Sequence, residues 1–264
     1  MPERTENAAY LTTSLRVPYV RYCDDAEFEK HLSIVREQAR LSQEIALFTE
    51  YSHRGYWPLD GVRRLAGLLK RRIAAYRRAG FARVGLNVLD TFGHMDDGCD
   101  RAEPPPMRTM VGLDGRVFRT CLCPTSDEFR TYIAEKYRIL AGTGADFIWV
   151  DDDFKLKNHG GVEICFCPGC IARFNRAEGR SETFASLTEA LRTDPFGRTA
   201  DRWHRFTVGE LTEVARIIRN AVRAADPAVE LGMMTVPDDR FPEHILCFEA
   251  WMTALGARKR STQC

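Results

Sequence analysis

The chain has 264 residues, of which 44% are hydrophobic and 28% charged, which is ordinary globular composition. Its formal net charge of +1 gives no sign of an electrostatic nucleic-acid binder, which usually carries a basic stripe. No apolar run approaches the roughly 20 residues that span a bilayer, and residues 1–14 lack the basic and apolar regions of a secretory signal, so we expect a cytoplasmic protein with neither a nucleic-acid nor a membrane partner.

Short apolar runs alternate along the chain with amphipathic helical patterns. Gly80 follows the second helical pattern as a stop, and Ser126 opens the third as an N-cap with acidic residues in its first turn. In chain order, we predict a strand at 17–23, a helix at 26–39, a strand at 44–48, a helix at 59–78, a strand at 83–89, a polar loop containing 104–106, a helix from 126 to about 141, a strand at 147–150, a helix at about 208–225 and a strand at 229–236.

This alternation of strands and helices predicts a parallel sheet covered by helices. Two folds fit, the (β/α)8 barrel and the doubly wound open sheet, but no glycine-rich phosphate turn follows any strand, which weakens the dinucleotide-binding form of the second. Polar residues collect instead where strands end, the position at which barrels place their active sites, so we favour the barrel. These residues are Glu50 and His53 after the second strand, Asn87, Asp90 and His94 at the third, and Asp151, Asp152 and Asp153 after the fourth.

The strand count falls short of a complete barrel. About five βα units are visible, whereas a complete barrel needs eight, and residues 256–264 are predicted to be unstructured. We therefore expect one α/β barrel domain over 1–264, with a metal-binding loop around 121–170. It is either a truncated barrel or the first part of a longer one.

Three of the nine cysteines lie within six positions, Cys165, Cys167 and Cys170. Tetrahedral zinc takes four ligands, and a C-x-x-C turn supplies two of them. Either Cys121 or Cys123 could provide the fourth. The alternatives are buried, unligated thiols or a redox pair, and the third cysteine at 165 argues against the redox pair.

The three consecutive aspartates end an apolar strand. Alternation places Asp151 and Asp153 on one side and Asp152 on the other. Because adjacent carboxylates repel, at least one pKa should rise, and such a carboxyl can act as a general acid. The other interpretations are a site for a hard cation and a simple loop cap. His159 follows as an orienting partner.

The run Cys123-Pro-Thr-Ser, a helix, a strand with Trp149, acidic residues at its end and then C-x-C-x-x-C resembles the β-galactosidases of glycoside hydrolase family 42. The resemblance covers roughly 121–174. It implies a (β/α)8 catalytic barrel and a structural zinc held by Cys123, Cys165, Cys167 and Cys170. That family carries Asn-Glu at the end of strand four, with the Glu as acid/base, whereas this chain has aspartates there.

We therefore expect a glycoside hydrolase-like protein acting on a carbohydrate, with Asp152 or Asp153 as general acid/base. Retaining hydrolysis needs two carboxyls about 5 Å apart, and the family's nucleophile, a Glu after strand seven, is absent if the chain stops after strand five. Two alternatives stay open. One is a metal-dependent hydrolase or lyase that uses the aspartates, and the other is a non-catalytic carbohydrate-binding fragment whose exposed core favours homo-oligomers. The substrate-binding residues predicted for the first hypothesis are Glu50, His53, Asn87, Asp90, His94, Asp151 and His159.

Overall fold

The computed structural model describes residues 13–42, 44–51, 56–93, 105–155, 163, 165–235, 245–257 and 259–262. Its centre is a six-stranded sheet in which every described pair of neighbouring strands is parallel. The strand order follows the chain without reversing, as in a barrel wound in one direction and unlike a doubly wound sheet. The strands are β1 (Ser14–Val17), β2 (Glu44–Phe48), β3 (Arg83–Val88), β6 (Phe147–Val150), β7 (Glu230–Thr235) and β8 (Lys259–Thr262).

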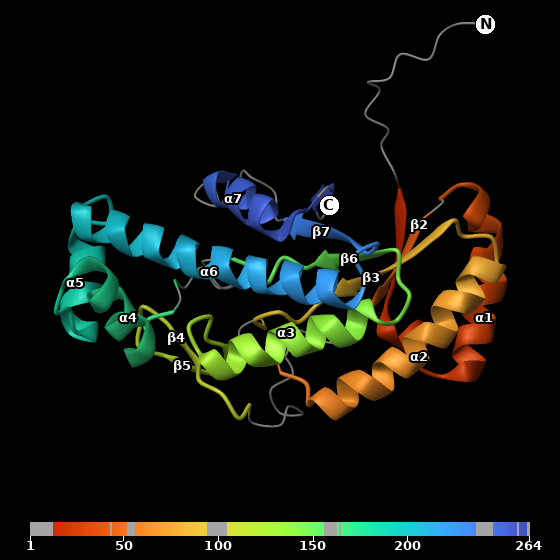
Figure 1. Cartoon of the computed structure of the whole chain (residues 1–264), viewed down its shortest axis with the longest axis horizontal. Helices are drawn as coiled ribbons and strands as arrows, with labels where there is room; N and C mark the ends of the chain where they lie inside the picture. The colour runs from red at the N-terminus through yellow and green to blue at the C-terminus, as the bar shows by residue number, and fades with distance from the viewer. Residues whose placement is uncertain are drawn as a thin grey trace, which may run out of the picture.

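Helices cover one face of this sheet. The apolar side chains of α2 that point inward recur every three or four residues, which is the spacing that gives a helix one buried side. The long α6 lies beside α3. The helices α1 and α2 lie at one end of the molecule, on the right in Figure 1. The helices are α1 (Asp25–Val35), α2 (Leu59–Arg78), α3 (Asp127–Ala141), α4 (Pro168–Glu178), α5 (Phe184–Thr193), α6 (Arg198–Ala225) and α7 (Ile245–Leu255).

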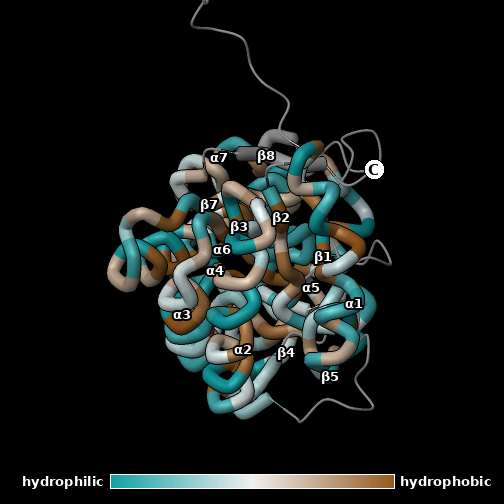
Figure 2. The backbone as a smooth tube through the Cα atoms, turned by 90° about the vertical axis from the view of Figure 1, so that its right-hand side faces the viewer, coloured by the Kyte–Doolittle hydropathy of each residue, from teal (hydrophilic) through white to brown (hydrophobic). Residues whose placement is uncertain are grey.

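Both hydrophobic and hydrophilic residues occur along α1, α2 and α3 (Figure 2), as expected of helices with one face on the core and one in water. Among the described residues, no helix is both long enough and apolar enough to cross a membrane.

The opposite face of the sheet carries a smaller apolar cluster formed by Ala46, Phe147, Trp149 and Met234. Two large rings fit there because the neighbouring strands present glycine. A Cβ added to Gly232 would lie 2.6 Å from the ring of Trp149, and one added to Gly85 would lie 2.3 Å from that of Phe147. The absence of these two side chains therefore makes the space for the rings.

A two-stranded antiparallel hairpin, β4 (Thr109–Val111) and β5 (Val117–Leu122), stands apart from the main sheet. It lies with α4 and α5 at the end of the molecule opposite α1 and α2 (Figure 1). Cys123 directly follows β5, and Cys167 caps the start of α4. The hairpin and α4 together bring the two cysteine-bearing segments to the same end.

The structure corrects four sequence predictions. The run at 17–23 is not a strand, because β1 ends at Val17 and a 3-10 turn, Tyr19–Arg21, follows Pro18. The polar loop after β3 contains the β4–β5 hairpin, and the C-terminal stretch contains β8 where no structure was expected. The main sheet thus has six strands rather than five. The strands at 44–48 and 147–150 and the helix at 59–78 are confirmed.

Candidate active site and metal centre

Hydrogen bonds connect the carboxyl ends of β2, β3 and β6. The Nδ2 of Asn87, on β3, donates to Asp151 Oδ2 at 2.7 Å, and Glu50 Oε2 accepts the backbone N–H of Leu89 at 3.1 Å. The structure thus joins Asn87 to Asp151 and places Glu50 against the backbone that follows β3, while their predicted role in substrate binding stays a prediction. The predicted residues His53, His94 and His159 lie outside the described residues.

Glu50 is part of a buried ion pair that the sequence analysis did not predict. The ammonium group of Lys136, from α3, lies 2.7 Å from Glu50 Oε1 and also donates to the backbone carbonyl of Asp90. The side chain of Lys136 is 0% exposed and that of Glu50 2%. Burial by itself lowers the pKa of Lys136, but the charges of Glu50 and Asp90 outweigh it and raise that pKa above its usual value. The amine therefore stays protonated between two strand ends.

Lys136 could have been found in the sequence. It falls on the buried stripe of α3 with Phe129, Ile133 and Leu140, at helical spacing. The charge of a lysine in the middle of an apolar stripe is costly to bury unless a carboxylate pairs with it. Its position therefore predicts an acidic partner, although not which one.

A second network joins β1, β3 and β6. The guanidinium of Arg16 donates to Asn87 Oδ1 at 3.1 Å and lies 3.8 Å from Asp151 Oδ2. It also lies over the ring of Phe48, 4.6 Å from the ring centroid. Asp151 is fully buried, and its Oδ1 accepts the backbone N–H of Asp152 at 2.7 Å. Arg16 was not predicted, because a lone arginine on a short strand carries no motif.

A cavity of about 460 Å³ opens beside this network, within the size range of small-molecule sites. Two of the residues that line it are charged, Arg16 and Glu50. The rest of the wall is aromatic or apolar and consists of Pro18, Tyr19, Val20, Phe48, Tyr51 and Leu89.

Asp153 is held differently from its two neighbours. Its Oδ2 accepts the backbone N–H groups of Thr91, Phe92 and Gly93 at 2.6–2.9 Å. Its Oδ1 is buried and has no hydrogen-bond partner within the described part of the chain. Burial, reinforced by the charge of Asp151, raises the pKa of Asp153 to about 7, although the three N–H groups oppose this rise. A carboxyl group in this state is about half protonated at neutral pH.

Asp152 lies 3.6 Å from the ammonium group of Lys155, and both side chains are almost fully buried. Burial lowers the pKa of Lys155, while the charges of Asp152, Asp153 and Asp151 oppose that effect. Each of the three aspartates thus meets a different environment. Asp151 lies beside Asn87 and Arg16, Asp152 lies beside a lysine, and Asp153 is bound by backbone amides.

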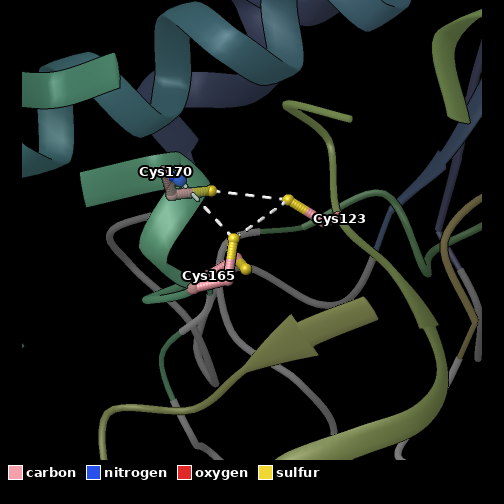
Figure 3. A group of neighbouring side chains, drawn as sticks. Cys123, Cys165 and Cys170 are labelled. Carbon is pink, nitrogen blue, oxygen red and sulfur yellow. Dashed lines mark hydrogen bonds between the residues drawn. The ribbon is translucent and has the colours of Figure 1, made fainter. Parts of the chain in front are cut away.

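Four buried cysteines, Cys123, Cys165, Cys167 and Cys170, form a separate cluster in which all Sγ atoms lie within 4.8 Å of one another. The Sγ atoms of Cys167 and Cys170 are each 3.5 Å from that of Cys123. The sulfur atoms of Cys123, Cys165 and Cys170 point toward one another (Figure 3). Cys121 is buried in the hydrophobic core and is not part of the cluster.

The cluster fits a tetrahedral metal ion. Zinc–sulfur bonds of about 2.3 Å imply sulfur–sulfur separations of roughly 3.8 Å, close to the distances observed. Hydrogen bonds from the neighbouring thiols lower the pKa of Cys123 well below its usual value, which favours the thiolate that binds metal. Among the described residues, no other group of histidine, cysteine or acidic side chains brings its donor atoms together in this way.

Surrounding residues hold the cysteine cluster in place. Burial lowers the pKa of Arg108, but contact with Cys123 and the nearby cysteines outweighs it and raises that pKa, so a cation lies beside the sulfurs. Glu210, on α6, binds Arg173 of α4 at 2.8 Å and Arg130 of α3 at 2.5 Å, and Arg130 also donates to the carbonyl of Pro124. One glutamate thereby connects the helices on both sides of the cluster.

Comparison with known proteins gives likeness of fold. No protein-family model matches this sequence, and no curated protein matches it. A solved β-galactosidase from Rahnella sp. R3 is similar over 100% of this chain and 40% of its own, with 14% identity and a TM-score of 0.57. The catalytic domain of a β-amylase from Paenibacillus polymyxa matches 96% of this chain and 76% of its own, at 11% identity and a TM-score of 0.64.

A third structure, the glycoside hydrolase family 42 β-galactosidase Gan42B from G. stearothermophilus, has 15% identity and a TM-score of 0.56 over 89% of this chain. This chain spans 37% of Gan42B and 40% of the Rahnella enzyme. At such identities the comparison establishes a fold like that of the glycosidase barrels and nothing finer.

Proposed function

We propose that this protein is a glycoside hydrolase in which Asp153 is the general acid and in which the cavity beside Arg16 and Glu50 receives a sugar. The observation that carries the proposal is the carboxyl group of Asp153. It lies at the carboxyl end of a central parallel strand, where barrel enzymes place their catalytic residues. Burial also raises its pKa to about 7, so that about half of the molecules carry a proton there at neutral pH.

The hydrogen bonds of Asp153 distinguish its two carboxyl oxygens. Three backbone N–H groups occupy Oδ2 and fix the carboxyl plane. The proton is therefore best carried by Oδ1, which has no partner among the described residues. A glycosidase acid must be protonated in the resting enzyme so that it can protonate the leaving oxygen. Asp152 is less suited to that role because it lies beside the ammonium group of Lys155.

The other predicted residues have supporting roles. Asn87 and Asp151 are hydrogen-bonded to each other at the end of the sheet. Lys136 connects Glu50 to the backbone carbonyl of Asp90. The four cysteines would hold a structural zinc ion, which ties the loop after β6 to the start of α3. That ion supplies rigidity rather than chemistry, because four protein ligands leave no open position for a substrate.

The test compares hydrolysis of two aryl glycosides that differ in leaving group, phenyl and dinitrophenyl, over a panel of sugars. We expect Asp153→Asn to reduce hydrolysis of the phenyl glycoside by about 10²–10⁴-fold. The loss on the dinitrophenyl glycoside should be much smaller, since that leaving group departs without protonation.

Asp152→Asn is the matched control, because it removes a neighbouring buried carboxylate of the same strand end. Asp152→Asn should change the rates of hydrolysis of the phenyl and dinitrophenyl glycosides by the same factor. If Asp153→Asn also lowers both rates by the same factor, Asp153 is not the acid. If the wild-type protein hydrolyses no member of the panel, glycoside hydrolysis is not its function.

A further inference from the structure

The cavity at the ends of β1, β2 and β3 contains a cation whose hydrogen-bonding capacity is largely unused. Arg16 lines the cavity, and its side chain is 32% exposed. Among the described residues, its guanidinium makes one hydrogen bond, to Asn87 Oδ1, and its ion-pair partner Asp151 is 3.8 Å away. The remaining N–H groups of this planar fork have no acceptor in the described part of the protein.

Asp151 does not accept the remaining hydrogen bonds that Arg16 can donate. Its Oδ2 accepts from Asn87 at 2.7 Å and its Oδ1 accepts the backbone N–H of Asp152 at 2.7 Å. Both oxygens are thus bound to other donors, and the carboxylate does not form the paired, two-bond contact that arginine makes with a carboxylate facing it. Burial lowers the pKa of Arg16 even though Asp151 and Asp152 oppose that effect, as expected of a cation with too few acceptors.

The other charge in the cavity wall is already neutralised. Glu50 Oε1 pairs with the ammonium of Lys136 at 2.7 Å, and Oε2 accepts from Leu89 N–H and from the hydroxyl of Thr49. The cavity therefore presents one cation with open donors against a wall of aromatic and apolar side chains. A ligand with an anionic group at one end and an apolar face at the other complements this surface.

We propose that Arg16 is a specificity-determining residue that binds the carboxylate of an acidic sugar, so that the substrate class is a uronic-acid glycoside rather than a neutral hexoside. The planar guanidinium matches the two oxygens of a carboxylate, and a ring face of the sugar packs on Tyr19, Tyr51 or Phe48. The contact of Arg16 with the Phe48 ring, 4.6 Å from Cζ to the ring centroid, helps to hold the guanidinium at the cavity wall. This inference rests on the proposed glycoside hydrolase function for the sugar, and on the geometry alone for the anionic group.

The experiment measures binding rather than turnover. Titration calorimetry on the purified protein compares the methyl glycosides of glucuronate and galacturonate, in both anomers, with those of glucose and galactose. At least one uronide should bind about ten-fold or more tightly than its neutral counterpart, the difference expected for hydrogen bonds to a charged group. Arg16→Gln should remove that difference, and Arg21→Gln should keep it.

Arg21→Gln is the matched control. Arg21 lies in the same 3-10 turn as Tyr19, is exposed and does not line the cavity. Arg21→Gln therefore removes one nearby charge and retains the guanidinium of Arg16. Arg16→Lys retains the charge but not the planar geometry and should recover only part of the preference. It also keeps the test decisive if Arg16→Gln fails to fold.

Four outcomes would overturn the inference. If neutral sugars bind as tightly as uronides, or if Arg16→Gln weakens both equally, the substrate is not acidic, and the proposed hydrolase function is untouched. If sulfate or acetate alone binds as tightly as a uronide, the site recognises an oxyanion and not a sugar. If no sugar binds at all, both this inference and the proposed function fail.

Discussion

Replacing Lys136 with methionine would leave Glu50 buried without its counter-ion. Their charged atoms are 2.7 Å apart and both side chains are almost inaccessible to solvent. At that separation and an effective dielectric constant of about 20, the attraction is about 6 kcal/mol, much of which offsets the desolvation of the two ions. Removing one partner of such a buried pair destabilises a protein by about 3–5 kcal/mol, a large part of the whole margin of a typical domain.

Urea denaturation followed by circular dichroism measures this loss as a change in the free energy of unfolding. Arg138→Met is the control on the same helix. Among the described residues Arg138 pairs only with Glu135, and its side chain is 55% exposed, so its replacement should change stability little. The double variant Lys136→Met/Glu50→Gln should recover a substantial part of the loss, since it removes the uncompensated charge. The reasoning is refuted if Lys136→Met costs less than about 1 kcal/mol, or if the double variant is no more stable than the single one.

Two further predictions concern Asp153 and the cysteines. Burial raises the pKa of Asp153 to about 7 in the folded protein, against about 3.9 for an unfolded chain. The folded state therefore binds this proton more tightly, and the stability it contributes is present at acidic pH and is lost as pH rises from about 4 to about 7. Asp153→Asn should flatten the pH dependence of the free energy of unfolding over that window, and parallel curves for variant and wild type would contradict the assignment. For the metal centre, elemental analysis should find about one zinc per chain, with Cys123→Ser losing it and Cys121→Ser retaining it, and a chelator should lower the melting temperature of the wild type but not of Cys123→Ser. Equal metal content in the two variants would contradict the cysteine assignment.

The parts of the fold that could be predicted are those where the sequence carries its own periodicity. The apolar runs of β2 and β6 are confirmed because strands buried on both faces need continuous apolar residues. The helix Leu59–Arg78 is confirmed because its apolar stripe is long and unbroken. Three members of the cysteine cluster were predictable because C-x-x-C spacing constrains a single turn, whereas the choice of Cys123 over Cys121 came from the resemblance to glycoside hydrolase family 42.

The parts that were missed depend on contacts between segments far apart in the chain. β8 is held by backbone pairing with β7, which leaves no hydrophobic pattern to recognise. The apolar run at 17–23 suggested a strand, but Pro18 has no N–H for a sheet and the chain turns there. The pairings of Lys136 with Glu50 and of Arg16 with Asn87 span 86 and 71 positions and follow only from the packing of α3 and β1 against the strand ends.

The pairing of Gly232 with Trp149 has a consequence for how the candidate site assembles. These two residues lie directly opposite each other on β7 and β6, and a Cβ at position 232 would collide with the indole. A slip of β7 by one residue would set Leu231 or Met233 against the tryptophan and turn its alternating side chains to the wrong face. Parallel sheets form slowly from distant segments and can misalign. The missing side chain of Gly232 therefore favours the observed register, because it leaves room for the indole of Trp149 against the neighbouring strand. This register also fixes the positions of the aspartates that follow Trp149, without any contribution from a bound substrate.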